Sequence, residues 1–518
     1  MGQEIELKLT LDEKALAQLP TSAPFAHVEF SSTAPKKLKA TYFDSTANAL
    51  RQKGVILRLR DEDGRLIQTL KGKKAFGSLA AGRAEFESRI PKTRTTPDFN
   101  RLPPDLKKGL QALLNGNNVE PLFETDVDRT IGMLKTDAGD SIELALDRGV
   151  IRAGRRETKV SELELELKKG DPASLYRVAL ELAETVPVRI GVRTKGERGY
   201  ALANALGPKS VKGEVVQLPK KANVEQALEL VLRHCLAHIV ANEPALVETV
   251  DEEALHQIRV GLRRLRAALA VFAPVLDKTM MKEMNAKART LAGLLGVARD
   301  YDVFRGELVA PLKEIDDEGV KALDRAATLE QINAWDAGLR AVSSTEFTRT
   351  CLSLALHIEE KSWRKRAEQD PAMAMMLAMP ARKFAERALT RRLKKANSLG
   401  EHIDRLNLAE RHELRKRLKS LKYATGFFAS LYPKKPVAKQ IKKLSALQDV
   451  FGSLNDLAVA EEIVRTLIGK SENTPNQLAI ATGGGRVLGW HGAQAVSHWN
   501  DASDAWVSFR ATTPFWRS

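Results

Sequence analysis

The stretch Glu4-Ile5-Glu6-Leu7-Lys8 decides how the first half of this 518-residue chain folds. In a β-strand alternate side chains face opposite sides, so Glu4, Glu6 and Lys8 share one face and the apolar residues between them share the other. Two carboxylates on one face can bind a hard divalent cation, and a lysine beside them can bind the phosphate that the cation carries. The stretch therefore predicts a strand whose charged face binds a divalent cation and phosphate.

The same alternation returns in later stretches that carry charges of both signs. One charged strand is usually the solvent-facing side of an antiparallel sheet. Five of them are better explained by charged faces that point inward around a polyanion, in a closed barrel whose apolar outside is covered by helices. The five are Glu4/Glu6/Lys8, Arg58/Arg60, Thr69/Lys71, Arg83/Glu85/Glu87 and Glu162/Glu164/Glu166/Lys168.

The residue types on these strands indicate metal-assisted phosphoryl chemistry. Carboxylates are the ligands that Mg²⁺ and Mn²⁺ prefer, and arginine and lysine donate hydrogen bonds to phosphate oxygens. A tunnel lined by both would bind a metal–triphosphate chain, and the metal would activate water and neutralise charge on the terminal phosphoryl group. The sequence contains no Walker A phosphate loop, so this is not the chemistry of a P-loop enzyme.

The composition limits the partners and the setting of the protein. The chain carries 82 Lys and Arg against 66 Asp and Glu, a formal net charge of +16, which favours phosphate-rich partners. Aromatic residues make up only 5%, so nucleic acid is disfavoured as a partner. The two cysteines, Cys235 and Cys351, indicate a reducing compartment rather than a disulfide framework. We find no apolar run of membrane-spanning length and no signal peptide, and we expect a cytoplasmic protein without a membrane partner.

The chain divides into two parts with different patterns. Residues 1–205 read as strands punctuated by Gly, Asp and Pro, with helices over 105–114 and 172–185. Residues 206–221 read as a linker, and residues 222–518 show the three- and four-residue apolar spacing of helices. We expect Gly483-Gly484-Gly485 to lie in a turn between two helices.

The helical part contains an internal repeat with an offset of 156 residues. The stretch that begins His256-Gln257-Ile258-Arg259 recurs as His412-Glu413-Leu414-Arg415, and Gly296 and Asp300 recur as Gly452 and Asp456 without a gap. So many matches at one offset indicate duplication of a helical unit.

Each copy of the repeat places basic residues along one helix face. These faces carry His256, Arg259, Arg263 and Arg266 in the first copy and His412, Arg415, Lys419 and Lys422 in the second. A single face of this kind is usually solvated, but two related faces brought together would form a groove for a long polyanion. Metal ligation by His256 and His412 with Asp300 and Asp456 is disfavoured, because the basic neighbours would repel a cation.

The ordered set of motifs in the first part resembles a CYTH domain, the triphosphate tunnel metalloenzyme family. The resemblance covers residues 1 to about 203. It rests on Glu4-x-Glu6-x-Lys8, Tyr42-Phe43-Asp44-Ser45, Leu57-Arg58-Leu59-Arg60, Thr69-Leu70-Lys71, Arg83-x-Glu85-x-Glu87, Glu162-x-Glu164-x-Glu166 and the closing Thr194–Tyr200.

This resemblance implies an eight-stranded antiparallel tunnel with bound Mg²⁺ or Mn²⁺. The implied metal ligands are Glu4, Glu6, Glu162, Glu164 and Glu166, although all three late glutamates share one face and the metal-binding pair stays open. Further acidic positions, for a second metal or for orienting water, are Glu85, Glu87 and Asp147. Glu4, Glu6 and Lys8 would be catalytic, and the implied phosphate ligands are Lys8, Arg58, Arg60, Lys71, Arg83, Arg129 and Lys195.

The second part, from about 222 to 512, resembles a CHAD domain. The resemblance rests on the His-x-x-Arg-Val-x-x-Arg-Arg-Leu-Arg stretch, on Arg299-Asp300-Tyr301-Asp302 and Asn455-Asp456, and on the closing Gly489-Trp490 and Pro514-Phe515-Trp516. It implies paired helical bundles with a basic surface that binds inorganic polyphosphate. The whole chain is then an α+β protein, a β tunnel followed by an all-α domain of two duplicated bundles.

These patterns lead to one principal function and several alternatives. We expect hydrolysis of inorganic tripolyphosphate to pyrophosphate and phosphate, with the helical domain as an accessory polyphosphate binder. A class IV adenylate cyclase or a thiamine triphosphatase is the first alternative, although we identify no residue that would form an adenine pocket. A polyphosphate-binding protein without catalysis is the second alternative.

Overall fold

The computed structural model describes residues 5–22, 25–30, 35–62, 64–72, 79–80, 85–315 and 317–517, without the side chains of residues 315, 408, 453 and 495–500. Glu4 and Arg83, two of the predicted site residues, lie outside the described residues. The chain forms two compact units. The first combines residues 1–210, 240–251 and 343–360, and the second combines residues 211–239, 252–342 and 361–518.

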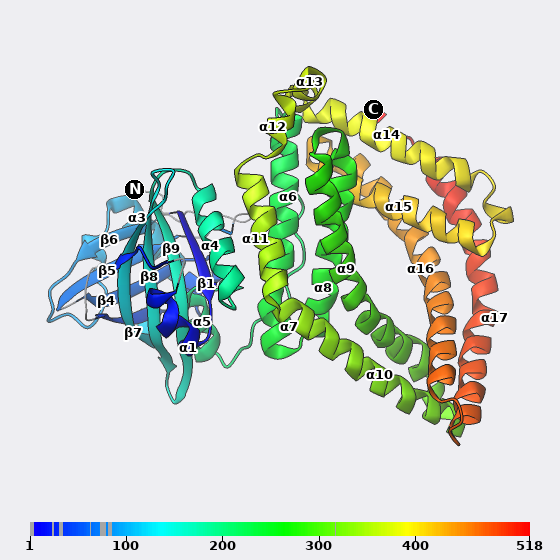
Figure 1. The fold of residues 1–518 in the computed structure, drawn as a ribbon, viewed down its shortest axis with the longest axis horizontal. Coiled ribbons are helices and arrows are strands. Elements are labelled where there is room, and N and C mark those ends of the chain that lie inside the picture. The colour runs from blue at the N-terminus through cyan, green and yellow to red at the C-terminus, as the bar shows by residue number, and fades with distance from the viewer. Residues whose placement is uncertain are drawn as a thin grey trace. The chain divides into compact units, whose positions relative to one another are not determined.

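The first unit is built on one antiparallel sheet (Figure 1). Over the described residues this sheet has ten strands rather than the expected eight, because two strands of two residues each, β2 and β10, add to eight longer ones. Over the described residues the ladder ends at β10 and at β6. The order is β10 (Arg189–Ile190), β1 (Ile5–Thr10), β9 (Arg156–Lys169), β8 (Ser141–Ala153), β7 (Glu120–Lys135), β3 (Lys36–Asp44), β4 (Ile56–Glu62), β5 (Arg65–Lys71) and β6 (Glu85–Arg89), with β2 (Glu29–Phe30) paired to β7.

The alternation of the first strand sets its register and its two faces. Lys8 lies opposite Glu164 and Glu6 lies opposite Glu166 in the β1–β9 ladder, so the charged residues of both strands share one face. On the other face Leu7 and Leu9 are fully buried, and helix α4 (Ala173–Thr185) packs there. The expected helices over 105–114 and 172–185 are therefore confirmed as α3 (Pro104–Leu114) and α4.

Other helices complete the first unit. Helix α11 (Thr345–Glu359) packs against α4, and Arg177 of α4 donates to the carboxylate of Glu360 at 2.6 and 3.0 Å. The unit built on the sheet thus includes two helices that lie beyond residue 222 in the sequence. Its remaining helices are α1 (Glu13–Gln18), α2 (Ala49–Gln52), α5 (Lys195–Ala203), α7 (Glu243–Thr249) and α11 (Thr345–Glu359).

The second unit is helical and duplicated. Helices α8 and α15 begin and end 156 residues apart, and α9 and α16 also begin 156 residues apart. Its helices are α6 (Val224–Ala241), α8 (Glu252–Phe272), α9 (Lys278–Val303), α10 (Glu318–Ser343), α12 (Trp363–Ala367), α13 (Pro371–Ala378), α14 (Ala381–Gly400), α15 (Leu408–Phe428), α16 (Lys434–Lys470) and α17 (Gln477–Arg510).

The two copies meet through equivalent residues at their first helices. The amide of Val224 donates to the carbonyl of Met379 at 2.9 Å, and the amide of Ala381 donates to the carbonyl of Ala222 at 2.8 Å. These reciprocal bonds flank the bridge between Asn223 and Pro380, which are 157 residues apart, one more than the offset of the later helices. Helices α6 and α14 are therefore counterparts in the duplication.

The glycine run Gly483-Gly484-Gly485 lies inside α17, so the prediction of a turn there is wrong. The turn occupies residues 471–476 instead. A Cβ on Gly483 would lie 2.1 Å from the carbonyl oxygen of Gly319 in α10, so glycine is needed there for the close approach of two helices.

Both cysteines are buried free thiols. Among the helices of the described residues, none combines the length and the apolar character needed to cross a membrane.

Candidate functional site

The concave face of the sheet encloses a polar cavity of about 370 Å³. All eight longer strands and the start of α5 contribute side chains to its wall, which explains why charges of both signs recur along the sequence. The charged lining residues are Glu6, Lys8, Arg58, Arg60, Lys71, Glu85, Glu87, Arg129, Glu143, Glu164, Glu166, Lys168 and Lys195. The structure thus brings most of the predicted residues to one place.

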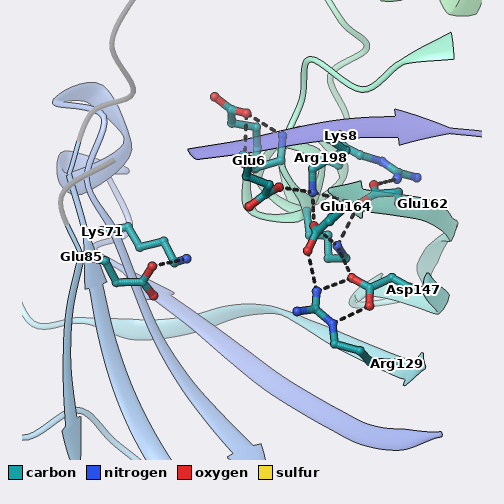
Figure 2. A network of polar contacts seen from close by, with 12 residues as sticks. Glu6, Lys8, Lys71, Glu85, Arg129, Asp147, Glu162, Glu164 and Arg198 are labelled. Atoms are coloured by element: carbon teal, nitrogen blue, oxygen red, sulfur yellow. Dashed lines mark hydrogen bonds and ion pairs between the residues drawn. The ribbon is translucent and has the colours of Figure 1, made fainter. Parts of the chain in front are cut away.

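Lys8 and Lys195 line the cavity and form the centre of an ionic network. Figure 2 labels Lys8, two arginines of the network and the carboxylates that they contact. Lys8 Nζ lies 3.1 Å from Glu162 Oε2 and forms a short ion pair with Glu164. Lys195 Nζ lies 2.8 Å from an oxygen of each of these glutamates and 2.6 Å from Asp147 Oδ2. Both ammonium groups are therefore held by several carboxylates at once.

Two arginines complete this network. Arg129 binds Asp147 through two parallel hydrogen bonds of 2.6 Å and reaches Glu164 Oε2 at the same distance. Arg198 donates to Glu162 Oε1 at 2.8 Å. All six carboxylate oxygens of the inner acids Asp147, Glu162 and Glu164 therefore contact a lysine or an arginine.

The electrostatics of the network keep its acids ionised. Burial alone would raise the pKa of Glu162, but Lys195 and Lys8 lower it to about 2. The pKa of Glu164 is also well below its usual range, since Lys195 and Lys8 outweigh the effect of burial. Burial opposes the charge of Lys8, yet Glu162 and Glu164 raise the pKa of its ammonium well above its usual value. Lys8, Glu162 and Glu164 are thus charged at neutral pH.

A second acidic group of the cavity is more exposed than Asp147, Glu162 and Glu164. Glu166 lies opposite Glu6 on β1 and opposite Glu143 on β8 in the two ladders. Lys168 Nζ lies 2.7 Å from Glu166 and 3.3 Å from Glu143, and Lys8 Nζ lies 3.6 Å from Glu6. These outer acids, Glu6, Glu143 and Glu166, are less neutralised than the inner ones.

The opposite wall is mainly basic. Lys71 Nζ contacts Glu85 at 2.6 Å, and Arg60 contacts Glu87 at 3.3 Å (Figure 2 shows the first pair). Arg58 lies 3.8 Å from Glu85. The Nε atoms of Arg58 and Arg60 are buried and have no hydrogen-bond partner within the described residues. This wall therefore offers donor capacity to an anion.

The residues present fit a divalent cation by their chemistry. Asp147, Glu162 and Glu164 bring oxygens within 4.8 Å of one another. Asp147 and Glu162, however, do not line the cavity, and their oxygens already bind lysine and arginine. Glu164 and the outer acids do line it. Oxygen ligands that substrate can reach are what Mg²⁺ and Mn²⁺ require, so the cavity-facing acids fit best.

A larger hollow of about 910 Å³ also lies in the first unit, but two of its arginines are neutralised by the glutamates of α7. Arg189 Nε donates to Glu243 at 2.5 Å, and Arg193 Nη2 contacts Glu248 at the same distance. We therefore place the functional site in the cavity of the sheet.

Sequence reasoning missed three residues of the site. Glu143 shares a strand face with Asp147, four residues later, so the alternation contained its signal. Arg198 follows Lys195 by three residues, the spacing of neighbours on a helix. Tyr42 lines the cavity and stacks on Phe123 with ring centroids 4.4 Å apart, a position that its sequence motif does not reveal.

The basic residues of the helical unit gather where α8 and α15 pack together. Arg259 lies 3.4 Å from Asp300, and Arg415 donates to Asn455 at 2.5 Å. Arg259 Nη1 and Arg415 Nε are buried without a hydrogen-bond partner in the part of the chain that the structure describes. The two copies thus present equivalent donors.

Mutual repulsion is strong on this paired face. Burial and the positive charges of Arg415, Arg263 and Arg259 together lower the pKa of Lys419 to about 7. Burial and nearby cations, Arg299 for His256 and Lys416 for His412, also lower the pKa of both histidines. Arg266 donates to Asn285 at 3.1 Å, and Lys422 is half-buried on the same helix as Lys419. The cations of α8 and α15 therefore act on one another across the two copies.

Comparisons with known proteins agree with both halves of this description. An inorganic triphosphatase of Haemophilus influenzae (strain ATCC 51907 / DSM 11121 / KW20 / Rd) is 32% identical over 211 residues, which cover 39% of this chain and 56% of that relative. An uncharacterised protein of Mycobacterium tuberculosis (strain CDC 1551 / Oshkosh) is 25% identical over 454 residues, 82% of each chain. The match to the first relative spans little more than half of its length.

The helical half also resembles a solved structure. The crystal structure of the CHAD domain from the plant Ricinus communis is 27% identical and superimposes with a TM-score of 0.51, covering 59% of this chain and 99% of that chain. Residues 2–200 match the CYTH domain family and residues 230–465 match the CHAD domain family. The chain is therefore a CYTH–CHAD protein, with a CYTH domain in its strand-rich half and a CHAD domain in its helical half.

Proposed function

We propose that the sheet cavity hydrolyses inorganic triphosphate to pyrophosphate and phosphate with a bound divalent cation. The observation that carries the proposal is the charge pattern of the cavity, in which a basic wall faces a group of carboxylates. The similarity to a relative named inorganic triphosphatase supports the same reaction class.

The basic residues would bind the phosphate chain. Arg58 and Arg60 carry buried Nε atoms that have no partner in the described chain, and guanidinium groups suit phosphate oxygens. Lys71, Arg129, Lys8 and Lys195 line the same cavity and would bind the remaining oxygens. Arg83 stays a sequence-based candidate for this role.

The acidic residues would divide into two roles. Glu6, Glu143, Glu164 and Glu166 face the cavity and would hold Mg²⁺ or Mn²⁺, with Glu4 as a further ligand on the sequence pattern. The bound cation would neutralise phosphate charge and lower the pKa of water. Asp147 and Glu162 would instead orient Lys195, Arg129 and Arg198. Glu85 and Glu87 would orient Lys71 and Arg60 in the same way.

The reaction itself is a simple hydrolysis. Water attacks the terminal phosphorus, the phosphoanhydride bond breaks, and pyrophosphate leaves with the electron pair of that bond. Charge develops on the leaving oxygen, and preorganised cations such as Lys8 and Lys195 would stabilise it at no reorganisation cost.

The helical unit would act as an accessory module that binds inorganic polyphosphate. The buried donors of Arg259 and Arg415 on the paired face of α8 and α15 support this role. Arg263, Arg266, Lys419 and Lys422 would add charge along the same helices.

The first test measures phosphate release from tripolyphosphate, ATP and thiamine triphosphate, with Mg²⁺, with Mn²⁺ and with a chelator. The variant Glu4→Gln/Glu6→Gln removes two candidate ligands, and Glu157→Gln is the matched control, since Glu157 pairs with Arg152 outside the cavity. We expect metal-dependent release from tripolyphosphate by wild type and control and about a hundredfold loss in the double variant.

The other outcomes discriminate the alternatives. Cyclic AMP and pyrophosphate from ATP would indicate a cyclase, and a preference for thiamine triphosphate would name that substrate. The absence of release from all three substrates with either metal would reject the enzymatic proposal and leave a polyphosphate-binding protein.

A further inference from the structure

Each copy of the helical unit ends in a Trp-Arg pair that packs on the first helix of the same copy. In the first copy this pair is Trp363-Arg364, and the indole of Trp363 donates to Glu225 of α6 at 2.9 Å. In the second copy the pair is Trp516-Arg517, and the indole of Trp516 donates to Thr390 of α14 at 3.1 Å. The two pairs thus lie against counterpart helices, although Thr390 corresponds to Arg233 and not to Glu225 at the offset of 157 residues.

In the first copy the basic residues beside Trp363 are neutralised by carboxylates of α6. Arg364 binds the Glu225 carboxylate through two hydrogen bonds of 2.6 and 2.7 Å. Lys361 lies 3.3 Å from Glu229, one helical turn further along α6. Two carboxylates of α6 therefore hold the cations that follow the last helix of the first copy.

The second copy lacks this carboxylate. At the offset of 157 residues Glu225 corresponds to Arg382, so the charge at this position is reversed. The guanidinium of Arg382 stacks over Tyr432, 5.1 Å from the ring centroid, and lies 3.5 Å from Glu386. Arg517 has therefore lost the partner that Arg364 has in the first copy.

Further cations surround the same place. A hollow of about 770 Å³ lies between α14 and the C-terminal 3-10 helix (Phe515–Arg517), and Figure 1 shows the C-terminus beside α14. Five basic residues and a single carboxylate, Glu386, line it. Arg387, Arg391, Lys394 and Arg517 are exposed, and no ion pair joins any of them to a described residue. The counterparts of the first three in α6 are Leu230, His234 and Ala237, so this charge belongs to one copy only.

We propose that this hollow is a second anion site of the helical unit and that it binds a chain of inorganic phosphate. The site is distinct from the paired face of α8 and α15. The proposal goes beyond hydrolysis in the sheet cavity and does not depend on it. The binding element, the α14 groove, is defined by Arg382, Arg387, Arg391, Lys394 and Arg517.

The geometry favours a phosphate chain over other polyanions. Arg382 and Lys394 are twelve residues apart, about 18 Å along the helix axis, so the charges form a line rather than a point. A flexible chain with a negative charge on every unit can follow such a line. Single-stranded nucleic acid gains affinity from stacking on exposed aromatic rings, and the ring of Trp516 is buried.

The test measures binding of short-chain inorganic polyphosphate to the full-length protein by calorimetry, with a chelator present to prevent hydrolysis. The background variant Arg263→Gln/Lys419→Gln weakens the paired face, so that the α14 groove dominates. In this background Arg387→Glu/Arg391→Glu is compared with Lys278→Glu/Lys282→Glu, an equal charge change on exposed residues of α9. Thermal unfolding verifies that each variant folds.

We expect the α14 variant to weaken binding by about tenfold or more and to flatten its salt dependence, while the α9 control changes affinity only slightly. Arg382→Glu places a carboxylate at the position that corresponds to Glu225 and should weaken binding by neutralising a neighbouring cation such as Arg517. Equal affinities of the α14 variant and the α9 control would overturn the proposal.

Competition identifies the ligand class. Polyglutamate and single-stranded DNA are titrated against bound polyphosphate in the same background. Polyphosphate should be the strongest competitor. Displacement by polyglutamate at lower concentration would instead indicate a docking site for an acidic protein, and stronger competition by DNA would indicate nucleic acid; either result overturns the assignment.

Discussion

At the scale of single residues, the first unit separates charges that line its cavity from charges that support them. Asp147 and Glu162 are fully buried and bind lysine and arginine rather than facing the cavity. Removing one partner from a buried network leaves another charge uncompensated, which costs more than an exposed ion pair contributes. This difference leads to two predictions.

Lys8→Met should destabilise the protein much more than Lys168→Met. Lys8 is buried between Glu162 and Glu164, whereas Lys168 is half-exposed beside Glu166. We expect a loss of about 3 kcal/mol for Lys8 and less than about 1 kcal/mol for Lys168, measured by urea unfolding. Equal losses would show that the inner network does not contribute more than a surface pair.

Acid should weaken the first unit through Glu162. Lys195 and Lys8 overcome burial and lower its pKa from the ordinary 4.5 to about 2, so its stabilising contribution is complete above about pH 4.5 and is lost as the pH falls toward 2. The full contribution is up to about 3 kcal/mol. Glu162→Gln should reduce the slope of unfolding free energy against pH in this window, and Glu157→Gln should leave it unchanged.

At the scale of elements, the duplication allows a residue in one copy to be compared with the equivalent residue in the other copy. Gly296 in α9 and Gly452 in α16 are equivalent, yet a Cβ on Gly296 would lie 2.6 Å from Arg259 Nη1, while a Cβ on Gly452 would meet nothing within 4 Å. Gly296 in α9 therefore leaves space for the guanidinium of Arg259, whereas no side chain occupies the corresponding space at Gly452 in α16.

Gly296→Ala should displace the Arg259 guanidinium and weaken polyphosphate binding several-fold without unfolding the helix. Gly452→Ala should leave binding unchanged, and each alanine raises helix propensity by about 1 kcal/mol. Calorimetric titration with polyphosphate compares the two variants. Similar effects at both positions would exclude a specific role of Arg259.

Lys419 should make polyphosphate binding depend on pH. Burial and the cations Arg415, Arg263 and Arg259 lower its pKa to about 7, so a fraction of the side chains is neutral at neutral pH. An anion favours the charged form, so binding should take up protons near pH 7 and should be tighter at pH 6 than at pH 8. Titration in buffers of different ionisation enthalpy measures this uptake.

The controls for this prediction lie on the same helix. Lys419→Gln should reduce the proton uptake, and Lys416→Gln should not, because Lys416 is exposed. Unchanged uptake in the Lys419 variant would assign it to another group, such as His256.

At the scale of the whole molecule, each of the two compact units is built from segments that are not continuous in the sequence. The unit built on the sheet includes α7 and α11, which lie within the helical part of the sequence. Glu243 and Glu248 of α7 pair with Arg189 and Arg193, and α11 packs on α4. The domain boundaries of 1–205, 206–221 and 222–518 remain a prediction from the sequence.

A chain ended at residue 210 should be less stable than the same sheet in the full-length protein. It would lose the helix that covers α4 and the carboxylates that pair with Arg189 and Arg193. Hydrogen exchange of the β1 and β9 amides in both forms measures the difference, and we expect faster exchange in the shorter chain. Equal protection would show that residues 1–210 fold independently of α7 and α11.

The sequence by itself determined the charged faces and the duplication. Side chains alternate along a strand with a period of two, so Glu6, Lys8, Glu164 and Glu166 could be placed on one face. The repeat predicted equivalent helices, and α8 and α15 share both ends at that offset. Local periodicity carries this information because it depends only on neighbouring residues.

Only the tertiary structure decided which charges contact one another. Glu162 and Glu164 belong to one motif, yet Glu162 lies behind the cavity wall and Glu164 lines it. Arg382 and Arg517 are far apart in sequence and line one hollow. The sequence pattern predicts a turn at Gly483, but this residue lies inside a helix. It is a glycine because the backbone of Gly319 approaches it too closely for a side chain. Such contacts join residues distant in sequence, and no local period encodes them.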